Sequence, residues 1–249
     1  MKKEKKSVKI VHCLSGGIFI LSFGLIVLHL CGHFMARTEY SSLSLRTAAM
    51  ISEAAEETEK VENGFEINPK LEGLKEINPD VIGWIEIPDT NIDYPVMQGD
   101  DNQYYMDHTI YGTDNVAGSI FMEVQNQDDF SDLVTFLYGH RMRDGSMFGN
   151  LKFYESEDYW KSHPEIYVST CREELIYDIF SVHRAALGDA TYTLFFEAGE
   201  GYEKYLQDEK EKSWYDTGIE VGRDDQILVL VTCTADQKDE RIVVLGKRR

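Results

Sequence analysis

Short runs of β-branched and aromatic residues alternate with turn-forming stretches from about residue 81 onward. Apolar runs of this length, bounded by polar clusters, are typical of β-strands. We predict eight strands, at 81–87, 92–97, 118–122, 133–139, 166–169, 175–184, 226–234 and 241–245. Eight short strands separated by turns indicate a mostly β fold in which the sheet closes, or nearly closes, into a barrel.

Helical patterns occupy intervals before and between these strands. A helix is expected at 69–77, because Pro69 suits a first turn and Asn78-Pro79 ends the segment. A second helix is expected at 199–212, and a short helix-like segment at 149–154. An Ala- and Glu-rich run at 51–62 favours a helical or partly frayed stalk whose acids face solvent.

The N-terminal residues follow a different pattern. Five lysines precede a stretch, 10–36, that contains no Asp, Glu, Lys or Arg. A helix of this length spans a bilayer of ~30 Å hydrocarbon thickness, and the basic head predicts a cytoplasmic N-terminus. The alternative is a cleaved signal peptide, but Met35-Ala36-Arg37 is a poor cleavage site. We expect a cytoplasmic basic head, a single-pass anchor in the cell membrane, a helical or flexible stalk and an extracellular domain, at 1–9, 10–36, 37–66 and 67–249.

Charge separates the same parts of the chain. The net charge is −19, but residues 1–37 hold six basic side chains against one acidic one, and the remainder holds 19 against 43. Phosphate contacts need clustered Lys and Arg, so the acidic remainder argues against nucleic-acid binding. The excess of acid favours a solubilising surface, with cationic amines or basic peptides as alternative partners.

Cys233 and Arg241 lie on the last two predicted strands. The strand at 226–234 is apolar almost to its end, so Cys233 ends a rigid element. A polar turn then returns the chain antiparallel and brings the Arg241 guanidinium back toward the thiol. A nearby cation favours the thiolate, which is the nucleophilic form. The alternatives are an inert strand cysteine and an arginine paired with neighbouring surface acids.

His140 ends another apolar strand, at 133–139. Two strands that deliver reactive side chains at their C-terminal ends can place both on one rim of a sheet. A histidine there supplies the acid–base group, and the set of nucleophile, histidine and cation suits acyl transfer. His108 and His163 fall in polar turns and His183 follows the middle of a strand, so they fit this role less well.

The four cysteines do not form a disulfide pattern. Cys13 and Cys31 lie in or beside the apolar N-terminal stretch, and Cys171 lies in a polar turn between two strands. A Cys171–Cys233 bridge is the alternative for an extracellular protein, but it would remove the nucleophile. We expect Cys171 to be an exposed bystander thiol.

Three blocks of sequence stand out together: Leu-Val-Thr-Cys at 230–233 followed by Arg241, Tyr-Gly-His-Arg-Met at 138–142 followed by Met-Phe at 147–148, and Asn-Pro-Asp-Val-Ile-Gly-Trp at 78–84. They resemble the motifs of sortases, the cysteine transpeptidases of Gram-positive cell surfaces, and more narrowly those of class B. The resemblance covers roughly residues 67–249 with the motifs in the family's order. One departure is Val229, where the family usually has threonine, although another β-branched residue of similar shape fits a strand interior.

The resemblance implies an eight-stranded sortase barrel with an N-terminal helix and a helix in the insertion before the cysteine strand. It implies that the Cys233 thiolate attacks the Thr carbonyl of a C-terminal sorting motif of Pro-x-Thr type, and that bond cleavage follows Thr. His140 then protonates the leaving amine, while Arg241 and a backbone N–H near Thr234 stabilise the oxyanion. Candidate substrate-binding residues are Thr232, Thr234, Tyr192 and Thr193.

The partners implied are secreted proteins with a C-terminal sorting signal and a lipid-linked peptidoglycan peptide whose amine resolves the thioester. One alternative is a pilin-polymerising sortase, but the N-terminal lid with an Asp-Pro-aromatic motif is missing from this sequence. The other is an anchored binding protein with an inert barrel. No His/Cys spacing suits zinc and the acidic pairs lack EF-hand spacing, so we expect no metal and no cofactor.

Overall fold

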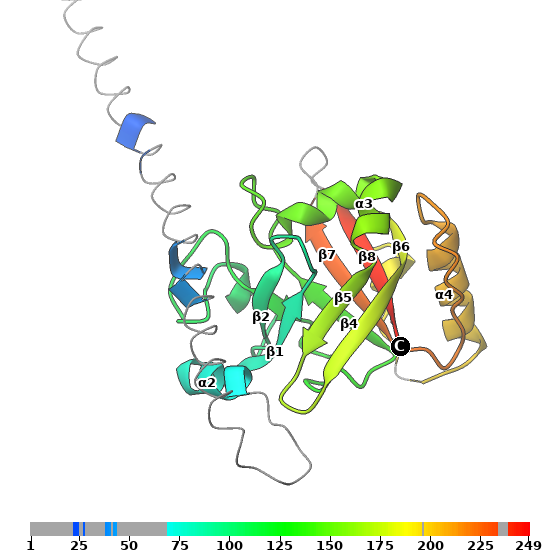
Figure 1. The fold of residues 1–249 in the computed structure, drawn as a ribbon, viewed down its shortest axis with the longest axis horizontal. Coiled ribbons are helices and arrows are strands. Elements are labelled where there is room, and N and C mark those ends of the chain that lie inside the picture. Colours follow the sequence, from blue (N-terminus) through cyan, green and yellow to red (C-terminus); the bar gives the residue numbers. More distant parts are fainter. Residues whose placement is uncertain are drawn as a thin grey trace, which may run out of the picture.

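The computed structural model describes residues 22–24, 27, 38–40, 42–43, 69–195, 197–233 and 239–249. Its centre is a closed barrel of eight strands (Figure 1). The strands are β1 (Val81–Glu86), β2 (Asp93–Met97), β3 (Ile120–Met122), β4 (Val134–Tyr138), β5 (Glu165–Ser169), β6 (Glu174–Ala186), β7 (Ile227–Cys233) and β8 (Glu240–Arg248). Each of them overlaps a predicted strand, so the mostly β barrel is confirmed.

The strand order around the barrel is β1-β2-β3-β4-β7-β8-β6-β5, and antiparallel pairing of β1 with β5 closes it. Two neighbouring pairs are parallel: β2 with β3, and β4 with β7. In the second pair Tyr138 lies opposite Val231, so the C-terminal ends of β4 and β7 meet at one edge. This is the shared rim that the sequence predicted for His140 and Cys233.

Three α-helices and three 3₁₀ helices are described: α2 (Pro69–Ile77), α3 (Glu157–Ser162), α4 (Glu200–Glu211), η2 (Tyr104–Met106), η3 (Phe148–Glu155) and η4 (Ala190–Tyr192). The predicted helices at 69–77 and 199–212 are confirmed as α2 and α4, which lie on opposite sides of the barrel (Figure 1). The helix-like segment at 149–154 is 3₁₀ in η3. The sequence missed α3, because six residues are too few for a periodic apolar face.

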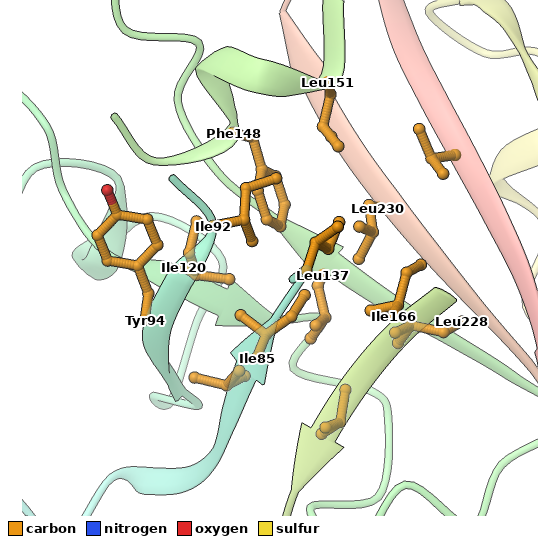
Figure 2. Packing of buried hydrophobic residues seen from close by; sticks show 14 of the residues in the cluster. Ile85, Ile92, Tyr94, Ile120, Leu137, Phe148, Leu151, Ile166, Leu228 and Leu230 are labelled. Atoms are coloured by element: carbon orange, nitrogen blue, oxygen red, sulfur yellow. The ribbon is translucent and has the colours of Figure 1, made fainter. Parts of the chain in front are cut away.

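The barrel interior is filled by alternate residues of the strands, capped at one end by Phe148 and Leu151 of η3 (Figure 2). On β7, Leu228 and Leu230 belong to this interior, whereas Val229 packs in a second buried cluster with residues of α4. A strand covered on both faces must be apolar at every position. This explains the uninterrupted apolar run that precedes Cys233.

A short N-terminal segment also packs on the barrel. Residues 38–40 and 42–43 are helical. The Tyr40 hydroxyl donates to the Gly118 carbonyl at 2.6 Å, and its ring meets that of Tyr94 edge-on. Leu43 is buried together with Leu71 of α2. These residues lie within the predicted stalk, whose boundaries stay a prediction.

The predicted anchor at 10–36 lies outside the described residues, apart from 22–24 and 27, and the charged run at 51–62 lies wholly outside them. Among the residues that are described, no helix combines the length and the apolar character needed to cross a membrane.

Candidate active site

His140 follows β4 directly and is held by main-chain contacts. The N–H of Gly139 donates to the carbonyl of Val231 at 3.2 Å, which extends the β4–β7 ladder up to the histidine. The His140 Nε2 lies 2.7 Å from the carbonyl oxygen of Met106, at the end of η2. Because a carbonyl oxygen only accepts, Nε2 carries the proton in this contact and Nδ1 is left for proton exchange.

The backbone of Gly139 lies so close to core side chains that there is no space for a Cβ atom. A Cβ at this position would lie 2.4 Å from Cδ1 of Ile120 and 2.8 Å from Cδ2 of Phe148, both buried in the barrel core. The close approach of the core to the backbone therefore requires glycine immediately before His140.

We expect Gly139→Ala to lower the free energy of unfolding by about 1–3 kcal/mol, because the added methyl overpacks the core. It should also displace His140 and lower kcat. Urea unfolding and peptide cleavage measure the two effects. Gly201→Ala is the matched control, since a Cβ on α4 meets open space; it should leave kcat unchanged and should not lower the free energy of unfolding, because alanine favours a helix more than glycine does. Equal behaviour of the two variants would contradict the prediction.

Cys233 is the last residue of β7, and its Cα pairs directly with that of Arg241 on β8. Directly opposed residues of an antiparallel pair have Cα atoms about 4.5–5.5 Å apart. The backbone therefore brings positions 233 and 241 together, as the predicted hairpin requires. Residues 234–238 of the intervening turn, Thr234 among them, lie outside the described residues.

A cleft of about 450 Å³ opens at this rim. It joins the ends of β4, β7 and β8 to η2 and η4, and its lining consists of Asn102, Met106, Phe121, Tyr138, Gly139, His140, Leu187, Gly188, Tyr192, Val231, Thr232 and Arg241. Its volume and mainly apolar wall suit a ligand of a few residues. The buried hydroxyl of Thr232 has no hydrogen-bond partner in the described chain. An unpaired buried hydroxyl is costly until a ligand satisfies it.

The sortase-domain family model matches residues 85–249. The chain is 35% identical over 184 residues to sortase B of Listeria monocytogenes serovar 1/2a, a match that covers 73% of this chain and 75% of the relative. The chain belongs to the sortase family.

Two solved structures carry the comparison further. Sortase B of Clostridium perfringens is 35% identical, with a TM-score of 0.68 over 72% of this sortase and 98% of that chain. The complex of Staphylococcus aureus sortase B with a substrate is 28% identical, with a TM-score of 0.76 over 86% of this sortase and 96% of that chain. Because these relatives are sortases B, we assign this chain to class B of the family, whose members are cysteine transpeptidases.

Of the residues proposed from the sequence, the sortase brings His140, Arg241, Thr232 and Tyr192 into the lining of one cleft. Thr193 is exposed and is not among the lining residues. For Cys233 the structure describes the backbone only, and this backbone lies at the rim, at the end of β7.

Several lining residues carried no signal in the sequence, among them Asn102, Met106 and Leu187. They come from loops and from η2, and Met106 holds His140 through a main-chain carbonyl. Every residue has a main-chain carbonyl, so the sequence alone cannot show that the carbonyl of Met106 contacts His140.

The other histidines of the described domain line no part of the cleft. His108 pairs with Asp107 and Asp114, and His163 bonds the carbonyl of Tyr159 at the end of α3. His183 is buried beside Glu209 at a separate place.

Cys171 of this sortase is a free, half-buried thiol. It follows Ser169 of β5, which pairs with the first residue of β6. The strand registers put this end of β5 beside the N-terminal end of β7. Cys233 ends β7, so the two cysteines lie at opposite ends of the barrel. The alternative of a Cys171–Cys233 bridge is therefore wrong. Cys171 is a free thiol, as expected, but it is half-buried where the sequence predicted an exposed one.

Proposed function

We propose that this sortase cleaves a C-terminal sorting motif of Pro-x-Thr type between Thr and a following Gly or Asn, and joins the Thr to an amine of a cell-wall precursor. The observation that carries the proposal is the common cleft of His140 and Arg241 at the rim where Cys233 ends β7. These three residues supply the proton donor, the cation and the nucleophile that acyl transfer needs.

The first step is attack of the Cys233 thiolate on the Thr carbonyl carbon, which turns the carbonyl oxygen into an oxyanion. Arg241 stands opposite Cys233 across the β7–β8 ladder. Its guanidinium is charged at every physiological pH and offers several N–H donors in a fixed plane. It stabilises both the thiolate and the oxyanion, and a backbone N–H near Thr234 adds a second donor.

The second step breaks the C–N bond. His140, as imidazolium, gives a proton to the leaving amine, and a thioester between Cys233 and Thr remains. The acceptor amine then attacks the thioester carbon, His140 takes up its proton, and the thiolate leaves. The contact between Nε2 and the Met106 carbonyl supports this role because it fixes the ring while Nδ1 exchanges the proton.

The apolar cleft wall supports recognition of a Pro ring and a Thr methyl group. Thr232, with its buried and unpaired hydroxyl, offers a hydrogen bond to the motif, and Tyr192 also lines the cleft. Thr234 stays a candidate as a neighbour of the nucleophile. Thr193 is the weakest candidate, since its side chain is exposed.

The proposed site of action is the outer face of the cell membrane. The uncharged stretch at 10–36 and the lysines before it support a single-pass anchor with a cytoplasmic N-terminus. The proposed partners are secreted proteins with a sorting signal and a lipid-linked peptidoglycan peptide. One membrane surface would then hold enzyme, substrate and acceptor together. Pilin polymerisation remains the alternative reaction, and family membership favours an enzyme over an inert binding protein.

The test is cleavage of a panel of quenched peptides that vary around Pro-x-Thr-Gly and Pro-x-Thr-Asn, with the full-length chain in detergent. Cleavage after Thr, followed by amide formation with an added glycine-type or lysine-type amine, supports the proposal and separates wall anchoring from pilin polymerisation. If the enzyme cleaves no peptide of the panel, the proposal is overturned.

We expect Arg241→Lys to lower kcat by about 10²-fold, because one ammonium replaces the planar donors that face the oxyanion. Steady-state cleavage of the best peptide measures the effect. Arg248→Lys is the matched control, since Arg248 lies at the other end of β8 and bonds Gln226 and Glu173. An unchanged kcat in Arg241→Lys would remove the residue from the proposed mechanism.

A further inference from the structure

One wall of the cleft is a short segment between β6 and α4. We call residues 187–192 the wall segment. Leu187, Gly188 and Tyr192 line the cleft, and the 3₁₀ helix η4 forms the end of the segment. The segment has main-chain hydrogen bonds of its own, such as those from the Tyr192 N–H to the Asp189 carbonyl and from the Leu187 N–H to the Asp239 carbonyl. Its middle also contacts side chains that lie behind it.

Behind the wall segment lies a largely buried cluster of ionisable groups. Glu209, on the inner face of α4, is 0% exposed, and His183 of β6 is 2% exposed. The Glu209 carboxylate is 3.1 Å from Nε2 of His183 and 2.8 Å from Nζ of Lys212. The hydroxyl of Ser181 donates to the Glu209 carbonyl at 2.6 Å. The carboxylate is thus fully buried but well paired, as a buried charge must be.

This cluster binds the wall segment at two residues. The Thr191 hydroxyl, itself fully buried, lies 2.9 Å from a Glu209 carboxylate oxygen. Lys212 reaches Asp189 at 2.7 Å, and the hydroxyl of Tyr205 donates to the Thr191 carbonyl at 2.9 Å. The two anchored residues therefore lie between the cleft-lining positions 188 and 192.

The ion pair between Lys212 of the cluster and Asp189 of the wall segment persists at neutral pH. Burial by itself raises the pKa of Asp189, but hydrogen bonds from Lys212 and Thr191 outweigh it and lower the pKa to about 2. Asp189 is therefore ionised under all physiological conditions and stays paired with Lys212.

The outer side of the wall segment gives it little support. Gly188 has a φ of +83°, and a Cβ there would meet nothing within 4 Å, while Leu187 is 59% exposed. The inner contacts with Glu209 and Lys212 hold the middle of the segment, while the Tyr192 hydroxyl donates to the Ala185 carbonyl at 3.3 Å. Buried ionic groups add little net stability over apolar packing of the same volume. We therefore expect the contribution of this cluster to lie in the position of the wall segment.

We propose that the cluster of Glu209, His183 and Lys212 is a positioning device for substrate recognition, which holds the wall segment at the distance that the sorting peptide requires. It acts on peptide affinity and leaves the chemical step to the catalytic residues. The inference rests on the proposed function, because the wall matters only when a peptide occupies the cleft.

The decisive variant is Thr191→Val, which keeps the shape of the side chain and removes the hydroxyl that Glu209 binds. We expect KM for the best sorting peptide to rise roughly tenfold, with kcat changed by less than about twofold. Thr191→Ser restores the hydroxyl and should restore KM. Glu209→Gln should raise KM in the same way, and it also removes one of the two carboxylates that pair with Lys212.

The matched control is Asp208→Asn. Asp208 is the neighbour of Glu209 on α4 but forms an exposed pair with Lys204, so its KM should equal that of the wild type. All variants are tested as full-length protein, with thermal midpoints and the rate of thiol alkylation by iodoacetamide measured alongside. The positioning proposal predicts that KM rises in Thr191→Val and Glu209→Gln while the rate of alkylation stays at the wild-type value.

Three outcomes overturn the positioning proposal: a wild-type KM in Thr191→Val, a loss confined to kcat, or a KM in Thr191→Ser that stays as high as in the valine variant. Each leaves the proposed function intact, since the wild type still cleaves. If the wild type cleaves no peptide of the panel, the proposed function fails and the positioning proposal fails with it.

Discussion

Replacing Cys233 by alanine is expected to abolish cleavage, with kcat/KM falling by a factor of about 10⁴–10⁶. In the proposed mechanism the Cys233 thiolate forms the covalent bond to Thr, and none of the described side chains that line the cleft is a thiol. The fold should persist, because the change shortens one side chain at the end of a strand whose core positions are untouched. Cleavage assays, together with mass spectrometry of the thioester trapped on the wild type, measure the loss.

Cys171→Ala is the control for this experiment. Its thiol lies at the opposite end of the barrel, in a turn near α2, so activity should equal that of the wild type. A thiol reagent should then inactivate Cys171→Ala and have no further effect on Cys233→Ala. Substantial cleavage by Cys233→Ala would move the nucleophile elsewhere and overturn the mechanism.

The second large effect is expected for His140→Ala, with kcat lower by about 10²–10⁴-fold. Without the imidazole the leaving amine must depart without a proton, and the acceptor amine has no base. Adding imidazole to the buffer should restore part of the rate, because the side chain lies in an open cleft that admits small molecules.

A pH–rate profile adds a sharper test of the same residue. The wild type should show a limb that reflects an essential histidine, and this limb should be absent from His140→Ala. His163→Ala is the control, since His163 bonds only within the α3 region and should keep the wild-type profile. A retained limb in His140→Ala would assign the proton transfer to another group.

The barrel could be predicted because each strand is marked by a pattern of a few consecutive residues. A run such as 227–231 is apolar at every position since the interior and α4 cover its two faces. Strands such as β5 instead alternate buried and partly exposed positions, which is also a local pattern. The cysteine–arginine pairing was predictable too, because a strand, a polar turn and a second strand fix a hairpin. The lengths of β6 and β8 were underestimated: β6 continues to Ala186, and β8 continues to Arg248, beyond the apolar residues, through pairing with β6 and β7.

What the sequence did not predict depends on tertiary contacts. The Met106 carbonyl orients His140, yet any residue has a carbonyl. Glu209 looked like one more acid on a charged helix, and only the packing of α4 on β6 makes it the buried partner of His183. Tyr192 and Thr193 were indistinguishable as neighbours in a loop, whereas the turn of η4 directs one to the cleft and the other to solvent.

The parallel pairing of β4 with β7 also determines when the enzyme can first exist. Val134 pairs with Ile227, and β8 then fits between β7 and β6. Contacts so distant along the chain form late and slowly, in roughly milliseconds to seconds for β-rich domains. A growing chain that lacks β8 has an open barrel and no arginine beside position 233. The pairing of position 233 with Arg241 therefore forms only after β8 has been synthesised.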